Sequence, residues 1–202
     1  GQCLMSSLIG GRSGNRGACA GSCRLKYDVI DKDGKKLNKD EYPLSTKDLN
    51  TLEYISDLID IGVSSLKIEG RLKTEFYLAN IVHAYRHALD DYEKDPENWN
   101  SEKYFKEVDK ARTRGVTDFF FNNKENKDTQ DFSGRQYNLD YEFAGVVINT
   151  DESQITTIEI RNKLSVGDKL EIMLPEVLEP VNITIEKLYD FETGEEIETV
   201  NP

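Results

Sequence analysis

Apolar residues recur with a helical period in three stretches between about residues 45 and 112. Each stretch carries an apolar face that a helix would bury against a neighbour. The first predicted helix begins at a cap on Ser45 or Thr46 and ends at Gly62, since glycine favours the left-handed conformation that closes a helix. The second runs from about Lys73 to Tyr92 and the third from Ser101 to about Arg112. The predicted apolar faces are, in order, Leu49, Leu52, Ile55, Leu58 and Ile59; Leu78, Val82, Tyr85, Leu89 and Tyr92; and Tyr104, Phe105, Val108 and Ala111.

Two shorter segments alternate in the manner of strands. Residues 63–70 place Leu66 and Ile68 against Lys67 and Glu69, which predicts a short strand between the first two helices. A helix–strand–helix order is typical of a parallel α/β layer, as in a βα barrel. Nearer the N-terminus, Tyr27–Ile30 and Lys35–Leu37 flank an Asp-Gly turn and predict a hairpin.

The period changes to two in the last third of the chain. Residues 122–138 are polar and aperiodic, which predicts a linker. Five strands are predicted beyond it, with Asp, Gly, Pro and Asn at the turns: residues 141–150, 154–162, 167–174, 181–188 and 195–200. This pattern indicates a small antiparallel barrel or sandwich. The expected fold class is therefore α/β plus all-β.

Composition and charge restrict the function. The chain has 202 residues and a formal net charge of −12, so it is not built to coat nucleic acid. Residues 1–26 differ, because they carry four basic side chains and no acidic one, which allows a local anion site. No apolar run approaches the roughly 20 residues that cross a bilayer, and no leader is visible. Three cysteines cannot all pair, so we expect a reducing, cytoplasmic location.

Cysteines provide the first candidate site. Cys3, Cys19 and Cys23 are the chain's three thiols, and all lie among the glycines of residues 1–24. Thiolates alone suit soft metals and iron–sulfur clusters, which normally take four cysteines. No histidine lies nearby to complete a zinc site. The alternative is three reduced thiols packed in tight turns, although neighbouring arginines would favour the ligating thiolate.

Two further candidates carry charge. Arg12, Asn15 and Arg16 stand among glycines and could clamp a carboxylate or phosphate, because guanidinium groups bind both in bidentate fashion. The loop lacks the lysine of a P-loop, and the alternative is an exposed, solvated basic loop.

Lys67, Glu69 and Arg71 follow the predicted strand of residues 63–70. In a βα barrel they would lie at the carboxyl end of a strand, where such enzymes keep their catalytic groups. The alternative is an ion pair at a strand end.

Both histidines lie on the second predicted helix. His83 and His87 are spaced i, i+4, which could hold zinc, but the glutamate of a zinc peptidase motif is absent. Both are predicted to lie opposite the apolar face, toward solvent. Metal binding there is disfavoured, and a histidine-assisted Ser or Cys nucleophile has little support.

Three segments of the sequence resemble the U32 family of collagenase-like peptidases. They are GQCLMSS followed by GGRSGNRGACAGSCR, the stretch from YPLSTKDL to YRHALD, and FAGVVINT with IEIRNKLSVGDKLEIMLP. The resemblance implies the C-terminal part of a TIM-like βα barrel at residues 1–121, a linker at 122–138 and a small β-barrel at 139–202. The chain starts without methionine inside a glycine-rich loop, so we expect it to be part of a longer protein.

The resemblance also implies an activity. Family members are described as peptidases, and relatives hydroxylate a wobble uridine of tRNA, drawing on prephenate, or a cytidine of ribosomal RNA. Related hydroxylases hold a 4Fe-4S cluster on four cysteines; Cys3 and Cys19 match the second and third, and Cys23 lies beside them. We expect the longer protein to hydroxylate tRNA through such a cluster. The first alternative is a peptidase that cleaves peptides, and the second is a β-domain that acts only as a binding or lid module.

Three expectations concern this chain by itself. We expect no activity from it alone, because half of the barrel and one cysteine ligand would be absent. Residues 1–120 would expose apolar helix faces, which predicts self-association. A membrane partner is not expected.

Overall fold

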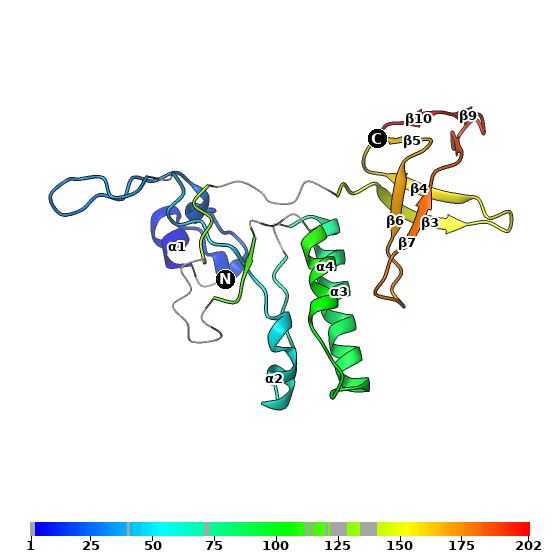
Figure 1. Cartoon of the computed structure of the whole chain (residues 1–202). Helices are drawn as coiled ribbons and strands as arrows, with labels where there is room; N and C mark the ends of the chain where they lie inside the picture. The colour runs from blue at the N-terminus through cyan, green and yellow to red at the C-terminus, as the bar shows by residue number, and fades with distance from the viewer. Residues whose placement is uncertain are drawn as a thin grey trace.

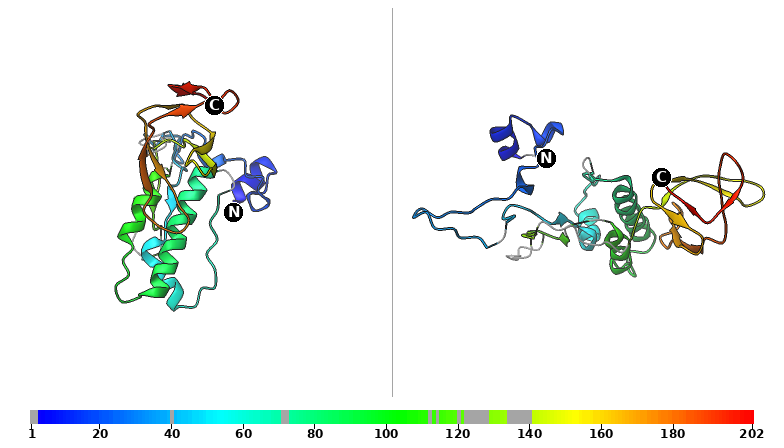
Figure 2. Two further views of the ribbon diagram at one scale, coloured as in Figure 1. Left: turned by 90° about the vertical axis from the view of Figure 1, so that its right-hand side faces the viewer. Right: turned by 90° about the horizontal axis from the view of Figure 1, so that it is seen from above.

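The structure is a computed structural model that describes residues 3–39, 41–70, 73–111, 113, 115–119, 121, 129–133 and 141–202, without the side chain of Asn15. It combines helices and strands in three successive parts (Figure 1). Short helical turns lie at the N-terminus, three helices stand side by side in the middle, and the strands gather at the C-terminal end. Figure 2 shows the same order of parts from two further sides.

The middle part contains the hydrophobic core. It is built from η3 (Leu52–Tyr54), α2 (Ile55–Asp60), α3 (Glu75–Lys94) and α4 (Glu102–Lys110). The buried core residues are Leu52, Ile55, Tyr77, Ile81, Ala84, Ala88, Tyr104, Val108 and Ala111. Alanines on α3 allow the facing helices to approach closely, and the large side chains of α4 fill the space between them. The third predicted helix and its apolar face are confirmed.

The first predicted helix is shorter than expected. Residues 48–49 form β1 (Asp48–Leu49), which pairs in parallel with β2 (Val116–Thr117). The helix therefore begins at η3, while Gly62 closes it as predicted, with φ 84°. The strand predicted at residues 63–70 is wrong. Leu66 and Ile68 do pack against the core, but alternation of side chains does not make a strand without a partner for its backbone hydrogen bonds.

The second predicted helix is confirmed as α3, and Leu78, Tyr85 and Leu89 of its predicted apolar face pack against the core. The buried residues are Tyr77, Asn80, Ile81, His83, Ala84 and Ala88. Val82, placed on the predicted face, is 49% exposed, whereas His83, predicted to face solvent, is 8% exposed. The prediction followed the large apolar side chains and missed the small and polar ones. Those residues lie between α3 and its neighbours.

The C-terminal part consists of antiparallel pairs, and all five predicted strand regions contain strands. The elements are β3 (Gly145–Thr150), β4 (Thr156–Ile160), β5 (Leu164–Ser165), β6 (Lys169–Ile172), β7 (Val181–Thr184), β8 (Leu188–Tyr189), β9 (Glu196–Ile197) and β10 (Thr199–Val200). The pairs are β3–β4, β6–β7, β8–β9 and β5–β10. Each is a two-stranded sheet, so the described residues do not form the closed β-barrel that was expected.

The first part of the chain holds the cysteines. It contains α1 (Leu4–Gly10), η1 (Gly14–Arg16) and η2 (Ser22–Arg24). The predicted hairpin follows it and is confirmed by a bridge between Ile30 and Lys36. None of the helices described is long and apolar enough to span a membrane.

The predicted linker falls mostly outside the described residues. Its described part, residues 129–133, is not free, because Gln130 forms a bridge with Thr46. In addition, the amide of Asp131 donates to the carbonyl of Ser45 over 2.9 Å. These five residues are therefore bound to the first half of the chain.

Candidate functional site: the cysteine and arginine loops

Ser6 organises the N-terminal loops. Its side chain is fully buried. The hydroxyl Oγ donates to the carbonyl of Arg12 over 2.6 Å and accepts from the amide of Ala20 over 2.9 Å. One hydroxyl therefore links α1, the arginine loop and the loop that carries Cys19. Nothing in the sequence pattern distinguished Ser6 from the other serines.

The three cysteines are free thiols at partly exposed positions. The Sγ of Cys3 accepts from the amide of Ser6, and the Sγ of Cys19 accepts from the amide of Gly21, each over 3.3 Å. These contacts orient two of the sulfur atoms. Within the described ranges, however, no three His, Cys, Asp or Glu side chains gather closely enough to hold a metal. Thiolate sulfur is a suitable ligand for iron, but the three cysteines are not arranged as ligands of one metal.

The turn that carries Cys23 is held in place by hydrogen bonds of the neighbouring residue. The neighbouring Arg24 donates from Nη1 to the hydroxyl of Ser45 over 2.8 Å and to the carbonyl of Thr46 over 2.7 Å. Ser45 is itself buried. Arg24 therefore ties the Cys23 turn to the segment before β1. From the sequence, Arg24 was expected only to add positive charge to the N-terminal region.

The arginine loop lies between the two cysteine segments. Arg12 and Arg16 are exposed, and the side chain of Asn15 lies outside the described part of the chain. Gly11 and Gly17 have φ values of 60° and 72°, which a residue with a Cβ rarely adopts. They turn the chain on either side of the guanidinium groups. The loop therefore places two arginine side chains at the surface, and the anion site stays a prediction.

The third candidate group is only partly described. Lys67 and Glu69 are exposed on the extended segment before α3, and Arg71 lies outside the described residues. Leu66 and Ile68 point toward the core, as predicted. Because residues 63–70 form no strand, the predicted position of the three charged residues at a strand end is not confirmed, and their role stays a prediction.

A partly buried ion pair was missed by the sequence analysis. Lys73 donates from Nζ to Asp48 of β1 over 2.6 Å and lies 4.2 Å from the ring centroid of Tyr77. Burial, with the nearby Asp48 carboxylate, raises the pKa of Tyr77 to about 12. The contact joins β1 to the start of α3. Asp48 and Lys73 are 25 residues apart in the sequence and meet only because the chain folds.

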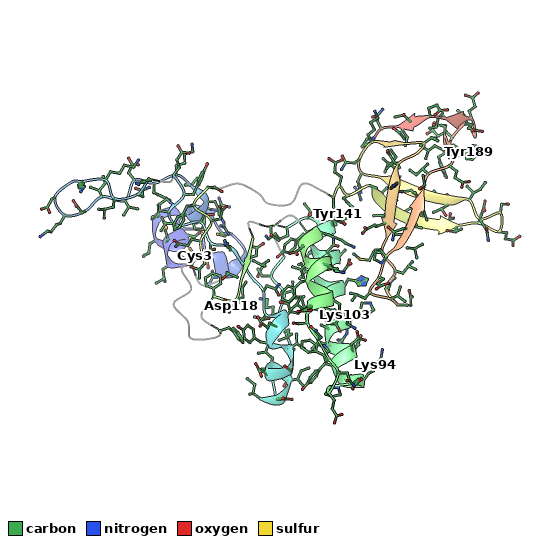
Figure 3. All side chains as sticks on the ribbon, viewed as in Figure 1. Cys3, Lys94, Lys103, Asp118, Tyr141 and Tyr189 are labelled. Atoms are coloured by element: carbon green, nitrogen blue, oxygen red, sulfur yellow. The ribbon has the colours of Figure 1, made fainter. Side chains whose placement is uncertain are left out.

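Polar side chains also follow β1 and β2. Asn50 and Asp118 come directly after these two parallel strands, and Tyr54 donates to Asp118 over 2.8 Å. Carboxyl ends of parallel strands are the usual place for ligands in α/β proteins. In Figure 3, Asp118 and Cys3 are labelled on the side of the molecule away from Tyr189, which marks the C-terminal strands. Any site that uses the cysteine loops or these strand ends therefore lies far from Tyr189.

Fold and site together define a mixed helix-and-strand protein with cysteine and arginine loops at its N-terminus and a strand domain at its C-terminus. The family is identified by comparison with known sequences. The model of peptidase family U32 matches residues 1–131, and the model of the peptidase family U32 C-terminal domain matches residues 139–202. The chain belongs to peptidase family U32. No solved structure matches it with statistical significance.

Curated relatives include proteins named for RNA modification and proteins named as collagenase or protease. The tRNA hydroxylation protein P1 of Bacillus subtilis is 37% identical over 206 residues, which cover 98% of this chain and 48% of the relative. The tRNA hydroxylation protein P of Escherichia coli is 26% identical over 93% of this chain and 51% of its own length. A collagenase of Porphyromonas gingivalis is 40% identical over 94 residues, or 46% of this chain and 23% of the relative. The chain thus spans about half the length of the first two relatives.

Proposed function

We propose that the whole protein acts in the prephenate-dependent 5-hydroxylation of a tRNA wobble uridine through an iron–sulfur site. The observation that carries this proposal is the extent of the similarity. A relative named as a tRNA hydroxylation protein aligns with 98% of the chain, through both the U32 region and the C-terminal domain. The similarity to a collagenase covers less than half of the chain, and that to a relative named as an uncharacterized protease covers 86% of it.

The N-terminal loops supply the groups that this reaction needs. Cys3, Cys19 and Cys23 would hold the cluster, with a further ligand from outside the chain, and the cluster would supply redox chemistry. Within the described residues these thiols are not gathered into one ligand set. The chain's own contribution is positional: Ser6 and Arg24 hold the cysteine loops in place.

Charge favours one end of the molecule for the substrate. Arg12 and Arg16 are exposed at the N-terminal end, and residues 1–26 contain no acidic residue. RNA phosphates and the carboxylates of prephenate are both bound well by guanidinium groups. The C-terminal strands are strongly acidic and would repel RNA. The substrate is therefore expected to contact the cysteine and arginine loops.

The second candidate function is peptide hydrolysis, which the similarity to a collagenase favours. Hydrolysis needs an activated nucleophile or a metal-bound water. In the part of the chain that the structure describes, neither histidine lies beside a cysteine or serine as a base would. This candidate is therefore placed second.

Iron analysis of the full-length protein, purified without oxygen, tests the proposal first. We expect about four irons and four sulfides per chain with broad visible absorbance, as thiolate-bound clusters give. Cys19→Ser should lose both signals, while Ala18→Ser, a matched change at the adjacent residue, should keep them. An iron-free protein that leaves Cys19→Ser unchanged would overturn the cluster.

Activity is measured separately by mass spectrometry of tRNA from a deletion strain. Plasmid-borne wild type should restore the hydroxylated wobble uridine, with a dependence on prephenate supply, and Arg12→Ala with Arg16→Ala should restore less. Restoration of gelatin cleavage without any change in tRNA would instead establish the peptidase.

A further inference from the structure

The helix α1 carries three large apolar side chains at the surface. Leu4, Leu8 and Ile9 are 75%, 81% and 73% exposed. Leu4 and Leu8 are spaced i, i+4, so they lie one above the other, and Ile9 lies on the adjacent side of the helix. Single exposed apolar residues are common, whereas several together on one short helix form a patch of the kind that binds another surface.

This apolar surface has a positive rim. Arg12 and Arg16 follow α1 in the sequence, and both side chains are exposed. Residues 1–26 contain four basic side chains and no acidic one. We call Leu4, Leu8, Ile9, Arg12 and Arg16 together the α1 patch. Its chemistry fits a partner surface that combines an apolar group with carboxylates.

The β8–β9 hairpin in the C-terminal domain has this combination. Phe191, in the turn of the hairpin, is 86% exposed, more than any other large apolar side chain in the part of the chain that the structure describes. Tyr189 beside it is 45% exposed. The same turn carries Glu192 and Glu195, and residues 141–202 contain fourteen acidic side chains against four basic ones. We call residues 188–197 the acidic hairpin.

The turn that carries Phe191 is held in one conformation. The Oδ1 atom of Asp190 accepts from the amides of Glu192 and Thr193 over 3.1 and 2.8 Å, and from the Thr193 hydroxyl over 3.0 Å. The amide of Gly194 donates back to the carbonyl of Asp190 over 2.9 Å. A preorganised turn loses little conformational freedom on binding, and aromatic side chains are enriched in protein interfaces. Phe191 is therefore suited to anchor a contact.

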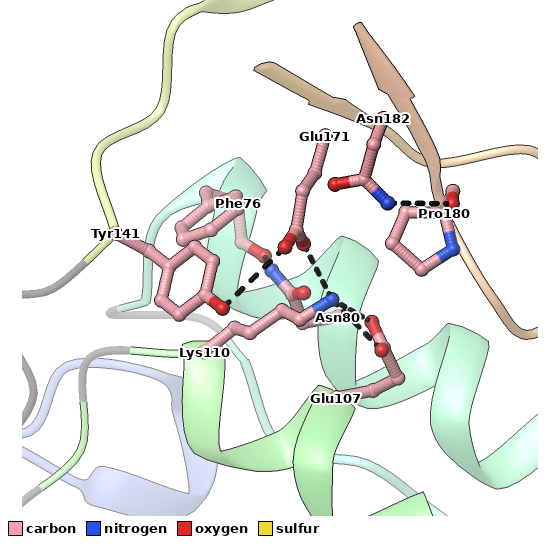
Figure 4. A network of polar contacts seen from close by, with 8 residues as sticks. All are labelled: Phe76, Asn80, Glu107, Lys110, Tyr141, Glu171, Pro180 and Asn182. Atoms are coloured by element: carbon pink, nitrogen blue, oxygen red, sulfur yellow. Dashed lines mark hydrogen bonds and ion pairs between the residues drawn. The ribbon is translucent and has the colours of Figure 1, made fainter. Parts of the chain in front are cut away.

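The α1 patch and the acidic hairpin cannot meet within one chain. They lie at opposite ends of the molecule in Figures 1 and 3. The C-terminal domain is fixed to the helices, because Lys110 of α4 pairs with Glu171 of β6 over 2.7 Å (Figure 4) and Leu178 packs against the helical core. The complementary surfaces can therefore be used only between two copies.

We propose that the acidic hairpin of one copy docks on the α1 patch of a second copy, with Phe191 on the apolar residues and the carboxylates beside Arg12 and Arg16. Charge selects this arrangement. Each copy carries a net charge of −12, so most encounters between copies are repulsive. Residues 1–26 carry the opposite sign, so they attract the acidic hairpin and orient the encounter.

The contact is head-to-tail, because it joins two different surfaces. Such an interface leaves one surface of each kind unused in a dimer, so further copies can add to form a ring or an open chain. The proposal goes beyond the proposed function and does not depend on it, since it concerns association alone. A docked hairpin would nevertheless cover Arg12 and Arg16, which are also the candidate anion site.

The test is analytical ultracentrifugation of the full-length protein. We expect wild type to form dimers and larger species as the protein concentration rises. Association should weaken when the salt is raised from about 0.1 M to about 1 M, because the Debye length falls from about 10 Å to about 3 Å. A wild type that stays monomeric would mean that another copy does not cover α1, and would overturn the proposal.

Two single variants test the geometry. Leu8→Asp damages only the α1 patch, and Phe191→Asp damages only the acidic hairpin; both positions are highly exposed, so folding is expected to be preserved. Each variant alone should be monomeric. An equimolar mixture should form a dimer that grows no further, because the intact hairpin of one variant docks on the intact patch of the other. The mixture is also the folding control, since only folded variants can form this dimer.

Ile61→Asp is the matched control. Ile61 is 77% exposed but belongs to neither surface, so this variant should associate as wild type does. Association that persists in Leu8→Asp or Phe191→Asp would overturn the proposal. A mixture that stays monomeric would do so too, because in a symmetric interface each copy uses the same surface and neither variant could complement the other.

Discussion

Lys110 of α4 and Glu171 of β6 form a 2.7 Å ion pair that joins the helical part of the molecule to the C-terminal strands. The two residues belong to separate family models, so neither region contains the whole contact. The same lysine also pairs with Glu107. The junction between the two domains is therefore a specific polar contact with an apolar surround, formed by Phe76, Phe143 and Leu178.

Lys110→Met is expected to destabilise the chain by about 3 kcal/mol, because it leaves the buried Glu107 without a partner. The measurement is the free energy of unfolding in urea at neutral pH. Lys103→Met is the matched control: its ion pair with Asp91 is more exposed, with side chains 54% and 30% exposed, and should contribute less than about 1 kcal/mol. Equal losses in the two variants would contradict the assignment of Lys110 as a buried anchor.

Ser6→Ala is expected to loosen the cysteine loops. Removal of the buried hydroxyl leaves the carbonyl of Arg12 and the amide of Ala20 without that partner, at a cost of about 1–3 kcal/mol. Thiol labelling of Cys19 should become faster in the variant. Ser7→Ala, whose hydroxyl donates to a carbonyl on the exposed side of α1, should label at the wild-type rate. An unchanged labelling rate in Ser6→Ala would contradict the conclusion that Ser6 holds the cysteine loops together.

Stability is expected to fall on the alkaline side. The pKa values of Tyr77 and Tyr104 are raised to about 12, chiefly by burial and further by Asp48 and Asp91 respectively. Their folded pKa values exceed the unfolded value of about 10, so the stabilisation is complete below about pH 10 and is lost as the pH rises toward 12. Urea unfolding at a series of pH values measures the slope. Tyr104→Phe should flatten it, and Tyr189→Phe, an exposed change, should not.

Gly145→Ala is expected to disrupt the β3–β4 pair. A Cβ at this position would overlap the backbone carbonyl oxygen of Glu159, which cannot move aside as a side chain can. We expect a loss of about 1–3 kcal/mol in the free energy of unfolding. Gly10→Ala is the control, because its nearest neighbour would lie at an ordinary 3.6 Å from Ala20. Wild-type stability in Gly145→Ala would show that the strands are spaced more widely than described.

The sequence by itself determined the elements whose signals are local. The period of 3.6 predicted α3 and α4, and the period of two predicted the C-terminal strand regions, because side-chain periodicity is a property of neighbouring residues. Gly62 and Gly34 were assigned correctly to turns, since positive φ is a demand on the residue itself. The cysteines and arginines were identified as candidate functional residues because thiol and guanidinium reactivity also belongs to the residue itself.

The tertiary structure alone decided which faces were buried and which polar groups met. Residues 63–70 alternate like a strand yet have no ladder, because a strand also needs a neighbouring backbone. His83 was predicted to face solvent because α3 was assigned a single apolar side, whereas a second side packs under another domain. Ser6, Arg24 and Lys110 gained their roles from partners distant in sequence. Local pattern restricts the conformations open to a segment, whereas strand pairing and contacts between distant segments depend on how the whole chain packs.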